Sequence, residues 1–460
     1  MPEMKPTAPD LSEVTAATSG VFGQATTLLT ELVSIPSLSL PGSDPAILMD
    51  SATKVRDTFT GLLPWDSIDI YSAAGGAPAV IARKNPQPGF KTVMLYAHHD
   101  VQPAGDLQQW RSDPFVAEVR EGRMFGRGSA DDGAGIITHF SALSVLGELV
   151  PDGSGLGVVL FIEGEEESGS PTFAQLLHEH SALLHADLIV VADSDNPRPD
   201  VPALTTSLRG VVGVTVTLRT LASSVHSGLF GGPVPDALTT LVRLLATLHD
   251  DHGNVAVSGL ADASAIEGDV DEAGLRAEAG LLDGIEWWGS GSLSRRLWAK
   301  PAITVTGIDA PATHAASNTL LATASAKVSL RVPPGMPAAE AKDALESHLQ
   351  RVCPHGVEMA LENWEVGEAF ADDASGALGA EVEKALRDGF GHEVVRQGLG
   401  GSIPFIAQLQ QVFPDAEIAV TGVEDRESAA HGPNESVSLE MLERAARSEA
   451  LLLVRLASGV

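Results

Sequence analysis

The chain contains four short runs of apolar residues that have the length of strands and not of helices. They are rich in β-branched residues and are bounded by polar turn residues, which is typical of strands that are covered on both faces. The runs are residues 92–97, 157–162, 188–192 and 416–420. We predict that they form the centre of an α/β sheet.

Before the first run, and between the first run and the second, apolar residues recur every three or four positions, which is the spacing of amphipathic helices. This spacing predicts helices over residues 21–33, 47–62 and 133–149. Strands that alternate with helices favour parallel pairing through crossover connections. The first fold-class prediction is therefore a mostly parallel sheet.

After residue 199 the pattern changes. Residues 211–219 and 326–332 alternate apolar and polar positions, which predicts strands with one face toward water. Helical spacing accompanies them at residues 236–249 and 338–352, and long amphipathic helices return at residues 374–390 and 438–457. We predict one α/β domain, residues 1–206 and 369–460, interrupted by an inserted α+β domain, residues 207–368.

Each of the four apolar runs leads into acids or histidines. In chain order these are His98, His99 and Asp100; Glu163, Glu165, Glu166 and Glu167; Asp193 and Asp195; and Glu424, Asp425 and His431. Sheets of this class bind ligands at the carboxyl ends of their strands. We therefore expect these side chains to converge.

His98 and Asp100 are two residues apart, so in a strand they point the same way. Asp100 could then hydrogen-bond the ring nitrogen that a metal leaves free on His98. A lone histidine at a strand end is more often a core or surface residue, but the carboxylate on the same face favours a ligand.

Asp131 lies shortly after the segment Gly126-Arg127-Gly128. A dinucleotide-binding loop would need glycine or alanine where Asp131 stands, and its charge would repel a pyrophosphate. The two oxygens of a carboxylate exposed at such a turn can instead bridge two cations.

Glu165, Glu166 and Glu167 follow a buried run directly. Burying three unpaired acids together is costly, and cations would remove that cost. One glutamate could then bind metal while a neighbour carries protons. An equally favoured alternative is a helix N-terminus, where acids meet the helix dipole favourably.

Composition narrows the function classes. The formal net charge of -32 excludes a surface suited to nucleic acid or anionic membranes. Cys353 is the single cysteine, so neither an intramolecular disulfide nor a thiolate metal cluster can form. We find no membrane-spanning run and no secretory signal in the sequence, and we expect a cytoplasmic protein.

Other common catalytic motifs are missing from the sequence: the G-x-S-x-G elbow, the G-x-x-x-x-G-K-[ST] phosphate loop and the H-E-x-x-H helix. The remaining candidate ligands are imidazoles and carboxylates without sulfur. That set suits zinc, manganese or cobalt and does not separate them.

Several segments together resemble the cocatalytic di-metal metallopeptidase family of carnosinase-like dipeptidases, glutamate carboxypeptidase and aminoacylases. They are residues 96–103, 126–132, 163–170, 194–196, 226–228, 331–333, 400–404 and 431–435, in the order of the family. Val101-Gln102-Pro103 and Gly401-Ser402-Ile403-Pro404 are most similar to the cytosolic dipeptidase branch. The resemblance covers most of the chain.

The resemblance implies two divalent metal ions and a role for each matching residue. The metal ligands would be His98, Asp131, Glu167, Asp195 and His431, with Asp131 between the two ions. Glu166 would be the general base and Asp100 the residue that orients His98. The inserted domain would be a lid that makes a homodimer and supplies His226 to the reacting carbonyl. Arg331 would bind a substrate carboxylate, Ser402 and Gly401 would lie near the same group, and Asn318 would contact the substrate.

This sequence departs from the dipeptidase branch at three positions. Gly133 stands where lysine is usual, His99 where tyrosine is common, and Leu321 where proline is usual. None of them is an implied ligand. The departures therefore leave substrate specificity and the alignment around Asn318 open.

The implied activity is hydrolysis of dipeptides or short peptides. Two cations facing one water lower its pKa and present hydroxide to the amide carbon, while Glu166 accepts the proton. An amidohydrolase acting on N-acyl or N-carbamoyl amino acids would use the same groups. A catalytically silent peptide-binding protein is the alternative from another class, and for Arg331 alone a surface ion pair is the simpler interpretation.

Overall fold

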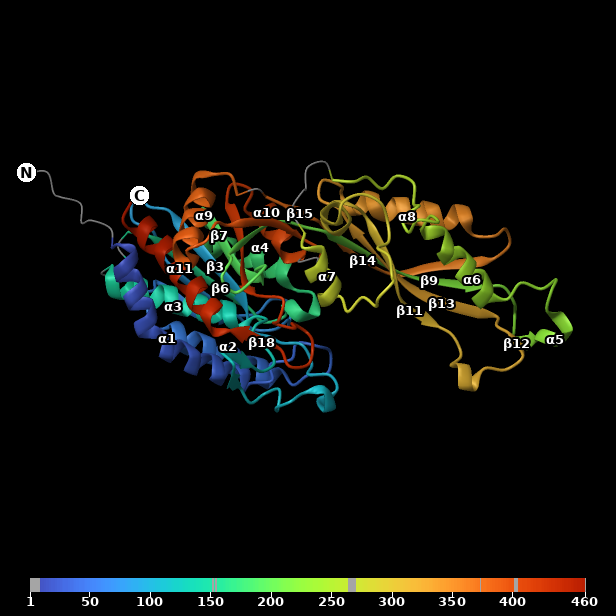
Figure 1. Ribbon diagram of the computed structural model, residues 1–460, viewed down its shortest axis with the longest axis horizontal. Coiled ribbons are helices and arrows are strands. Elements are labelled where there is room, and N and C mark those ends of the chain that lie inside the picture. The colour runs from blue at the N-terminus through green and yellow to red at the C-terminus, as the bar shows by residue number, and fades with distance from the viewer. Residues whose placement is uncertain are drawn as a thin grey trace, which may run out of the picture. The chain divides into compact units, whose positions relative to one another are not determined.

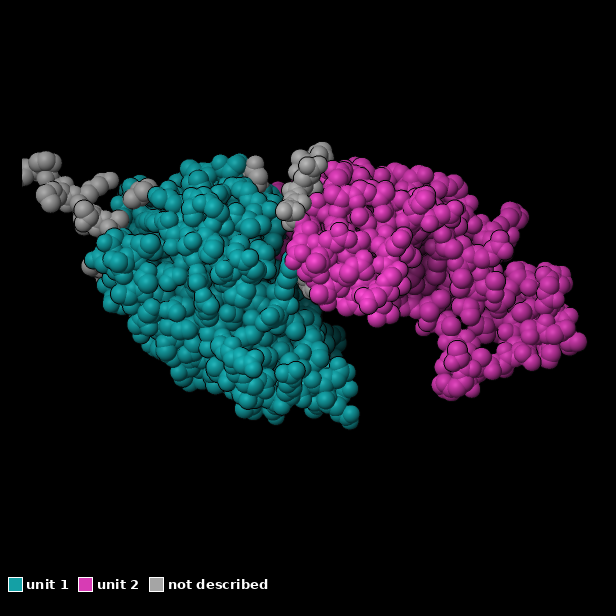
Figure 2. Space-filling view, in the orientation of Figure 1, with its two compact units in different colours: residues 1–206, 372–397, 408–460 teal, residues 207–371, 398–407 magenta. Residues whose placement is uncertain are grey.

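The structure is a computed structural model that describes residues 9–150, 153, 155–263, 270–372, 374–400 and 404–459. The chain forms two compact units, which Figure 2 shows in two colours. Unit 1 comprises Met1–Thr206, Asp372–Gln397 and Gln408–Val460, and unit 2 comprises Ser207–Ala371 and Gly398–Ala407. The short segment Gly398–Ala407 is therefore part of the inserted unit, although it lies far along the chain from the rest of it.

A large mixed sheet forms the centre of unit 1. Its strand order is β1 (Ser67–Tyr71), β2 (Ala79–Lys84), β6 (Gly157–Glu163), β3 (Thr92–His98), β7 (Leu188–Asp195), β17 (Glu417–Glu424), β8 (Ala203–Leu208) and β15 (Phe370–Ala371), and β16 (Val395–Leu399) pairs with β8. The four predicted apolar runs are β3, β6, β7 and β17, as expected. They pair with one another in parallel, in the order β6, β3, β7 and β17.

Outside this central group the strands pair antiparallel, namely β1 with β2, β2 with β6, β17 with β8 and β8 with β15. The prediction of α/β architecture is confirmed, with parallel pairing among the strands in the middle of the sheet. The central strands are buried on both faces, which explains their nearly continuous apolar sequences.

Helices cover both faces of this sheet (Figure 1). On one face, alternate strand residues such as Val93, Leu95 and Ala97 belong to a core shared with α1 (Leu11–Val33), α2 (Pro45–Phe59), α3 (Gly133–Leu149), α9 (Ala377–Phe390) and α11 (Leu439–Ala457). On the other face, Tyr96 and Phe161 pack against Phe173 of α4 (Phe173–Leu184), with ring centroids 5.5–6.3 Å apart. This packing fixes the strand ends from which the site is built.

Unit 2 contains a four-stranded antiparallel sheet in the order β11 (Ala302–Asp309), β13 (Thr323–Val332), β9 (Gly210–Arg219) and β14 (Glu358–Gly367). The apolar face of β9 and β13 packs on α6 (Ala237–Leu245) and α8 (Ala338–Val352). The alternating pattern predicted this two-faced arrangement, and both strands extend beyond the predicted residues at their N-terminal ends.

The remaining elements are short. A three-stranded sheet joins β18 (Ser436–Ser438), β5 (Arg123–Phe125) and β4 (Glu118–Arg120), and a two-stranded ladder joins β10 (Val225–His226) to β12 (Thr319–Leu320). Short helices are α5 (Ser227–Phe230), α7 (Glu272–Glu278) and α10 (Pro404–Val412). Within the described ranges, every helix is too short or too polar to cross a membrane.

Candidate dinuclear metal centre

The candidate site lies at the carboxyl ends of the central parallel strands of unit 1. His98 ends β3, Glu166 and Glu167 form a turn just after β6, Asp193 lies near the end of β7, and His431 lies in the loop after β17. The expected convergence at this edge of the sheet is therefore present.

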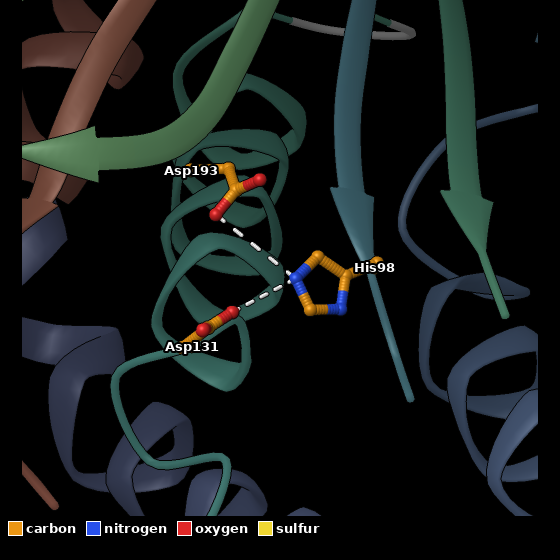
Figure 3. A group of neighbouring side chains, drawn as sticks. All are labelled: His98, Asp131 and Asp193. Carbon is orange, nitrogen blue, oxygen red and sulfur yellow. Dashed lines mark hydrogen bonds and ion pairs between the residues drawn. The ribbon is translucent and has the colours of Figure 1, made fainter. Parts of the chain in front are cut away.

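A first group of possible ligands combines His98, Asp131 and Asp193, whose donor atoms all lie within 4.8 Å of one another. The Nε2 atom of His98 is 2.9 Å from Oδ1 of Asp131 and 4.0 Å from Oδ1 of Asp193 (Figure 3). All three side chains point toward a common point between them. One imidazole and two carboxylates facing each other in this way can hold a divalent cation.

A second group shares Asp131 with the first. It combines Asp131, Glu167 and His431, again within 4.8 Å. Nε2 of His431 is 2.8 Å from Oδ2 of Asp131 and 3.2 Å from Oε2 of Glu167. The two oxygens of Asp131 therefore face different groups, Oδ1 the His98 group and Oδ2 the His431 group, which is the arrangement of a bridging carboxylate.

Asp193 takes the place that the sequence resemblance assigned to Asp195, so the expectation for Asp195 needs correction. Asp193 of β7 is grouped with His98 and Asp131, and Asp195 belongs to neither group of possible ligands among the described residues. The backbone oxygen of Asp195 accepts a hydrogen bond from Gln397 at 2.8 Å, and its charge helps to raise the pKa of Glu424. Asp193 is the first acid after the buried run 188–192, and this sequence signal could have identified it.

Asp100 connects the first group to the glutamates. Nδ1 of His98 is 3.0 Å from the backbone oxygen of Asp100 and 3.4 Å from its Oδ1. The same carboxylate accepts hydrogen bonds from the backbone N–H groups of Glu166 at 3.2 Å and Glu167 at 3.0 Å. Asp100 thus holds the ring of His98 and the turn that carries both glutamates.

Glu166 differs from Glu167 in its surroundings. Burial, together with the charges of Asp131, Glu167 and Asp100, raises the pKa of Glu166 to about 8, while the charge of His98 acts in the opposite direction. Glu167 accepts a 2.8 Å hydrogen bond from Gln102 and faces His431. Glu167 therefore faces the imidazole of His431, whereas the pKa of the neighbouring Glu166 carboxyl group is raised.

The electrostatics of the cluster fit bound cations. Burial and neighbouring carboxylates raise the pKa of Asp193 and Glu424 well above the usual range. Burial opposes ionisation of Asp131 too, but hydrogen bonds from His431 and His98 hold its pKa below the usual value. The donor set of imidazole and carboxylate oxygen suits zinc, manganese or cobalt, and positive charge at the shared Asp131 would offset the repulsion among the acids.

Glu435 accepts hydrogen bonds from the backbone next to Asp131, and the sequence pattern did not single it out. Its Oε1 accepts hydrogen bonds from the backbone N–H groups of Ala130 at 3.0 Å and Asp131 at 3.1 Å, and its Oε2 accepts one from Gly128 at 3.1 Å. Arg127 donates to the same carboxylate at 2.5 Å. Glu435 is completely buried and closes the matching segment 431–435, so its position beside His431 was the available signal.

Two departures from the dipeptidase branch are explained by space and hydrogen bonding. A Cβ atom on Gly133 would lie 2.4 Å from the backbone oxygen of Gly128 and 2.7 Å from Leu29, so the position cannot hold a side chain. His99 is buried, and its Nε2 is 2.7 Å from the backbone oxygen of Pro78. Neither residue belongs to either group of possible ligands.

The other expected site residues belong to unit 2. His226 and Asn318 lie side by side in the β10–β12 region, where the backbone N–H of Ser227 donates to the oxygen of Asn318 at 2.9 Å. Nδ1 of His226 accepts from the N–H of Gly228 at 3.0 Å, which leaves Nε2 as the protonated nitrogen. Arg331 lies on β13, opposite Val211 of β9. Gly401 and Ser402 lie outside the described residues.

Comparison with known proteins shows which family model the chain matches and which proteins it is similar to. The model of peptidase family M20/M25/M40 matches residues 94–455. The cysteinylglycine-S-conjugate dipeptidase of Corynebacterium striatum is 36% identical over 383 residues, which are 82% of this chain and 84% of that protein. The human Beta-Ala-His dipeptidase is 27% identical over 389 residues, 78% of this chain and 74% of that protein.

A solved structure of the di-peptidase Dug1p from Saccharomyces cerevisiae superposes with a TM-score of 0.82. The two chains are 21% identical in sequence, and the match covers 99% of this chain and 100% of the other. At that level of identity the likeness shows a shared fold.

Proposed function

The chain belongs to peptidase family M20/M25/M40, and from that premise we propose that it hydrolyses the peptide bond of dipeptides with the help of two divalent metal ions. The observation that carries the proposal is the position of Asp131 between the His98–Asp193 and the Glu167–His431 groups. The dipeptidase names of its relatives, among them the 36% identical one, support the substrate class.

In this proposal His98, Asp131 and Asp193 would hold one ion, and Asp131, Glu167 and His431 would hold the other. Bound divalent ions lower the pKa of a water molecule and polarise a carbonyl oxygen. The ions proposed are zinc, with manganese and cobalt as alternatives, since the ligand chemistry suits all three.

Side chains of the protein would carry out proton transfer, oxyanion stabilisation and substrate binding. Glu166 takes the proton of the attacking water on its carboxylate and delivers it to the departing amine. Asp100 keeps Glu166 and His98 in place through the contacts described above. His226 donates from Nε2 to the developing oxyanion, and Arg331, Ser402, Gly401 and Asn318 contact the substrate. The roles of these unit 2 residues follow from the family resemblance.

A homodimer through unit 2 is part of the same proposal. It is supported by apolar side chains on α5 and α6 that are exposed to solvent in the single chain: Leu229, Phe230 and Val242. Light scattering is expected to give about twice the chain mass of 47.8 kDa, and a monomer mass at micromolar concentration would contradict the dimer.

A cytoplasmic location, consistent with a single cysteine, is expected on cell fractionation, and recovery outside the cytoplasm would contradict it.

The activity is tested with free dipeptides and N-acyl amino acids of matched side chains. We expect kcat/KM for dipeptides to exceed that for N-acyl amino acids by at least about 10-fold, roughly 1.4 kcal/mol in transition-state binding. Activity should disappear after chelation and return when zinc, manganese or cobalt is added. Preferential hydrolysis of N-acyl amino acids by the metal-loaded protein would contradict the proposal, as would complete inactivity toward dipeptides.

A further inference from the structure

The loop between β17 and β18 carries His431 and contains several residues with left-handed backbone. The backbone N–H of Ser436, just after this His431 loop, donates to the oxygen of Ser428 at 2.9 Å and so closes the loop on itself. Between them, Ala429, His431 and Asn434 have φ angles of 52°, 60° and 63°. Residues other than glycine adopt such angles at a cost, so contacts from the surrounding structure are needed to hold the loop in this shape.

The shape of this loop matters because His431 is the exposed member of its ligand group. Its side chain is 58% exposed, whereas the side chains of Asp131 and Glu167 are 11% and 3% exposed. Packing therefore does little to hold the imidazole ring of His431 in place. The position of its Nε2 depends on the backbone of the loop, and so on the contacts that fix that backbone.

Arg123 of β5 contacts both ends of the His431 loop. Its Nη1 donates to Oδ2 of Asp425, the first residue of the loop, at 2.8 Å. At the other end, its Nε donates to Oγ of Ser436 at 2.9 Å, and its Nη2 donates to the backbone oxygen of Ser436 at 3.0 Å. Its Nη2 also lies 3.4 Å from Oγ of Ser428. One guanidinium group therefore joins the residues at which the chain enters and leaves the loop.

The ion pair between Arg123 and Asp425 is buried, and Asp425 makes further contacts within the loop. The two side chains are 11% and 2% exposed. Oδ1 of Asp425 accepts from the backbone N–H of Glu427 at 2.8 Å, and the backbone N–H of Asp425 donates to Oγ of Ser428 at 2.9 Å. A buried ion pair adds little net stability, because both charges lose their hydration, and its better-attested contribution is to select one conformation. The conformation selected here is that of the loop that presents His431.

We propose that Arg123 and Asp425 are positioning residues for one of the two metal ions, the one that Glu167 and His431 would hold. They act through the backbone of the His431 loop and not by touching the ion or the substrate. The other proposed ion site is built on the ends of β3 and β7, so its affinity should not depend on Arg123. The inference rests on the two-ion centre of the proposed function and adds to it that the two ion sites can be weakened separately.

Titration of the metal-free protein with Co²⁺, followed by calorimetry and visible absorption, measures the two affinities, and we expect two binding events in the wild type. In Arg123→Met the affinity of one event should fall about 10- to 100-fold, the scale on which partners of metal ligands contribute, and the other should change less than about 3-fold. His431→Ala removes a ligand and should weaken the same event, which identifies it. Arg123→Lys keeps the charge opposite Asp425 but lacks the planar fork, so it should recover part of the affinity.

Glu427→Gln is the matched control for Asp425→Asn. The carboxylate of Glu427 also lies near Nη1 of Arg123, at 3.8 Å, but its side chain is 80% exposed. Ion pairs in that setting contribute little, so Glu427→Gln should leave both affinities at the wild-type values. Asp425→Asn should weaken the same event as Arg123→Met, and the double variant should lose less than the two separate losses combined, because the two residues act as a pair.

Equal weakening of both binding events in Arg123→Met would overturn the proposal, because it would indicate a general loss of structure. Two unchanged affinities would overturn it as well. Should Arg123→Met fail to fold, Arg123→Lys and Asp425→Asn decide by the same criteria. Selective weakening supports the inference even in a protein that hydrolyses no dipeptide, an outcome that contradicts only the dipeptidase function. A wild type with a single binding event would contradict both.

Discussion

Glu166→Gln is expected to lower kcat for a dipeptide about 10³-fold, the scale on which a general base contributes. Glutamine has nearly the same shape as glutamate but cannot accept and return the proton. The backbone N–H of Glu166 would still donate to Asp100, so the turn that carries Glu167 should remain in place. KM and metal content are expected to stay close to those of the wild type.

The measurement is steady-state kinetics on protein whose metal content has been determined. Glu427→Gln is the matched control, because Glu427 lies in the loop that carries His431 and its side chain is 80% exposed. A variant with near wild-type kcat would show that Glu166 is not the base. A variant that loses metal together with activity would show that Glu166 is a ligand.

Asp131→Asn is expected to abolish the binding of at least one metal ion and to leave almost no activity. An asparagine side chain has one acceptor oxygen, so it cannot face His98 and His431 at once as Oδ1 and Oδ2 of Asp131 do. The affinity loss should exceed the roughly 10- to 100-fold that substitution of an outer-shell partner costs. Metal content after dialysis, followed by activity with excess metal, measures both effects.

Asp415→Asn is the control for that experiment, since Asp415 is exposed between α10 and β17. It should retain the wild-type metal content and rate. If Asp131→Asn kept two ions and normal turnover, Asp131 would not be the shared ligand, and the two groups would have to be independent.

The sequence predicted the central strands and most long helices because their patterns are local. Residues 133–149 and 338–352 coincide with α3 and α8, where apolar spacing alone defines the element. The antiparallel pairing of the outer strands of the large sheet was not predicted, because pairing direction depends on which strands become neighbours. The segment Gly398–Ala407 could not be assigned to unit 2 for the same reason.

Sequence patterns pointed to those site residues that follow a buried strand directly. They did not point to residues whose position depends on contacts between distant parts of the chain. His98 and Glu167 lie where the sequence placed them, at the ends of apolar runs. The choice between Asp193 and Asp195, which both lie in β7, depends on which of them faces His98 and Asp131, and a match to a sequence motif does not show that. Glu435 contacts backbone groups about 300 residues away in the sequence, and no local pattern reveals such contacts.

The central claim is that the carboxylate of Asp131 bridges two metal ions, and diffraction at the absorption edge of the bound metal tests it most directly. Crystals of the metal-loaded protein are expected to show two anomalous peaks, one against His98 and Asp193 and one against Glu167 and His431, with Asp131 in contact with both. A single peak, or two peaks that do not share Asp131, would contradict the account.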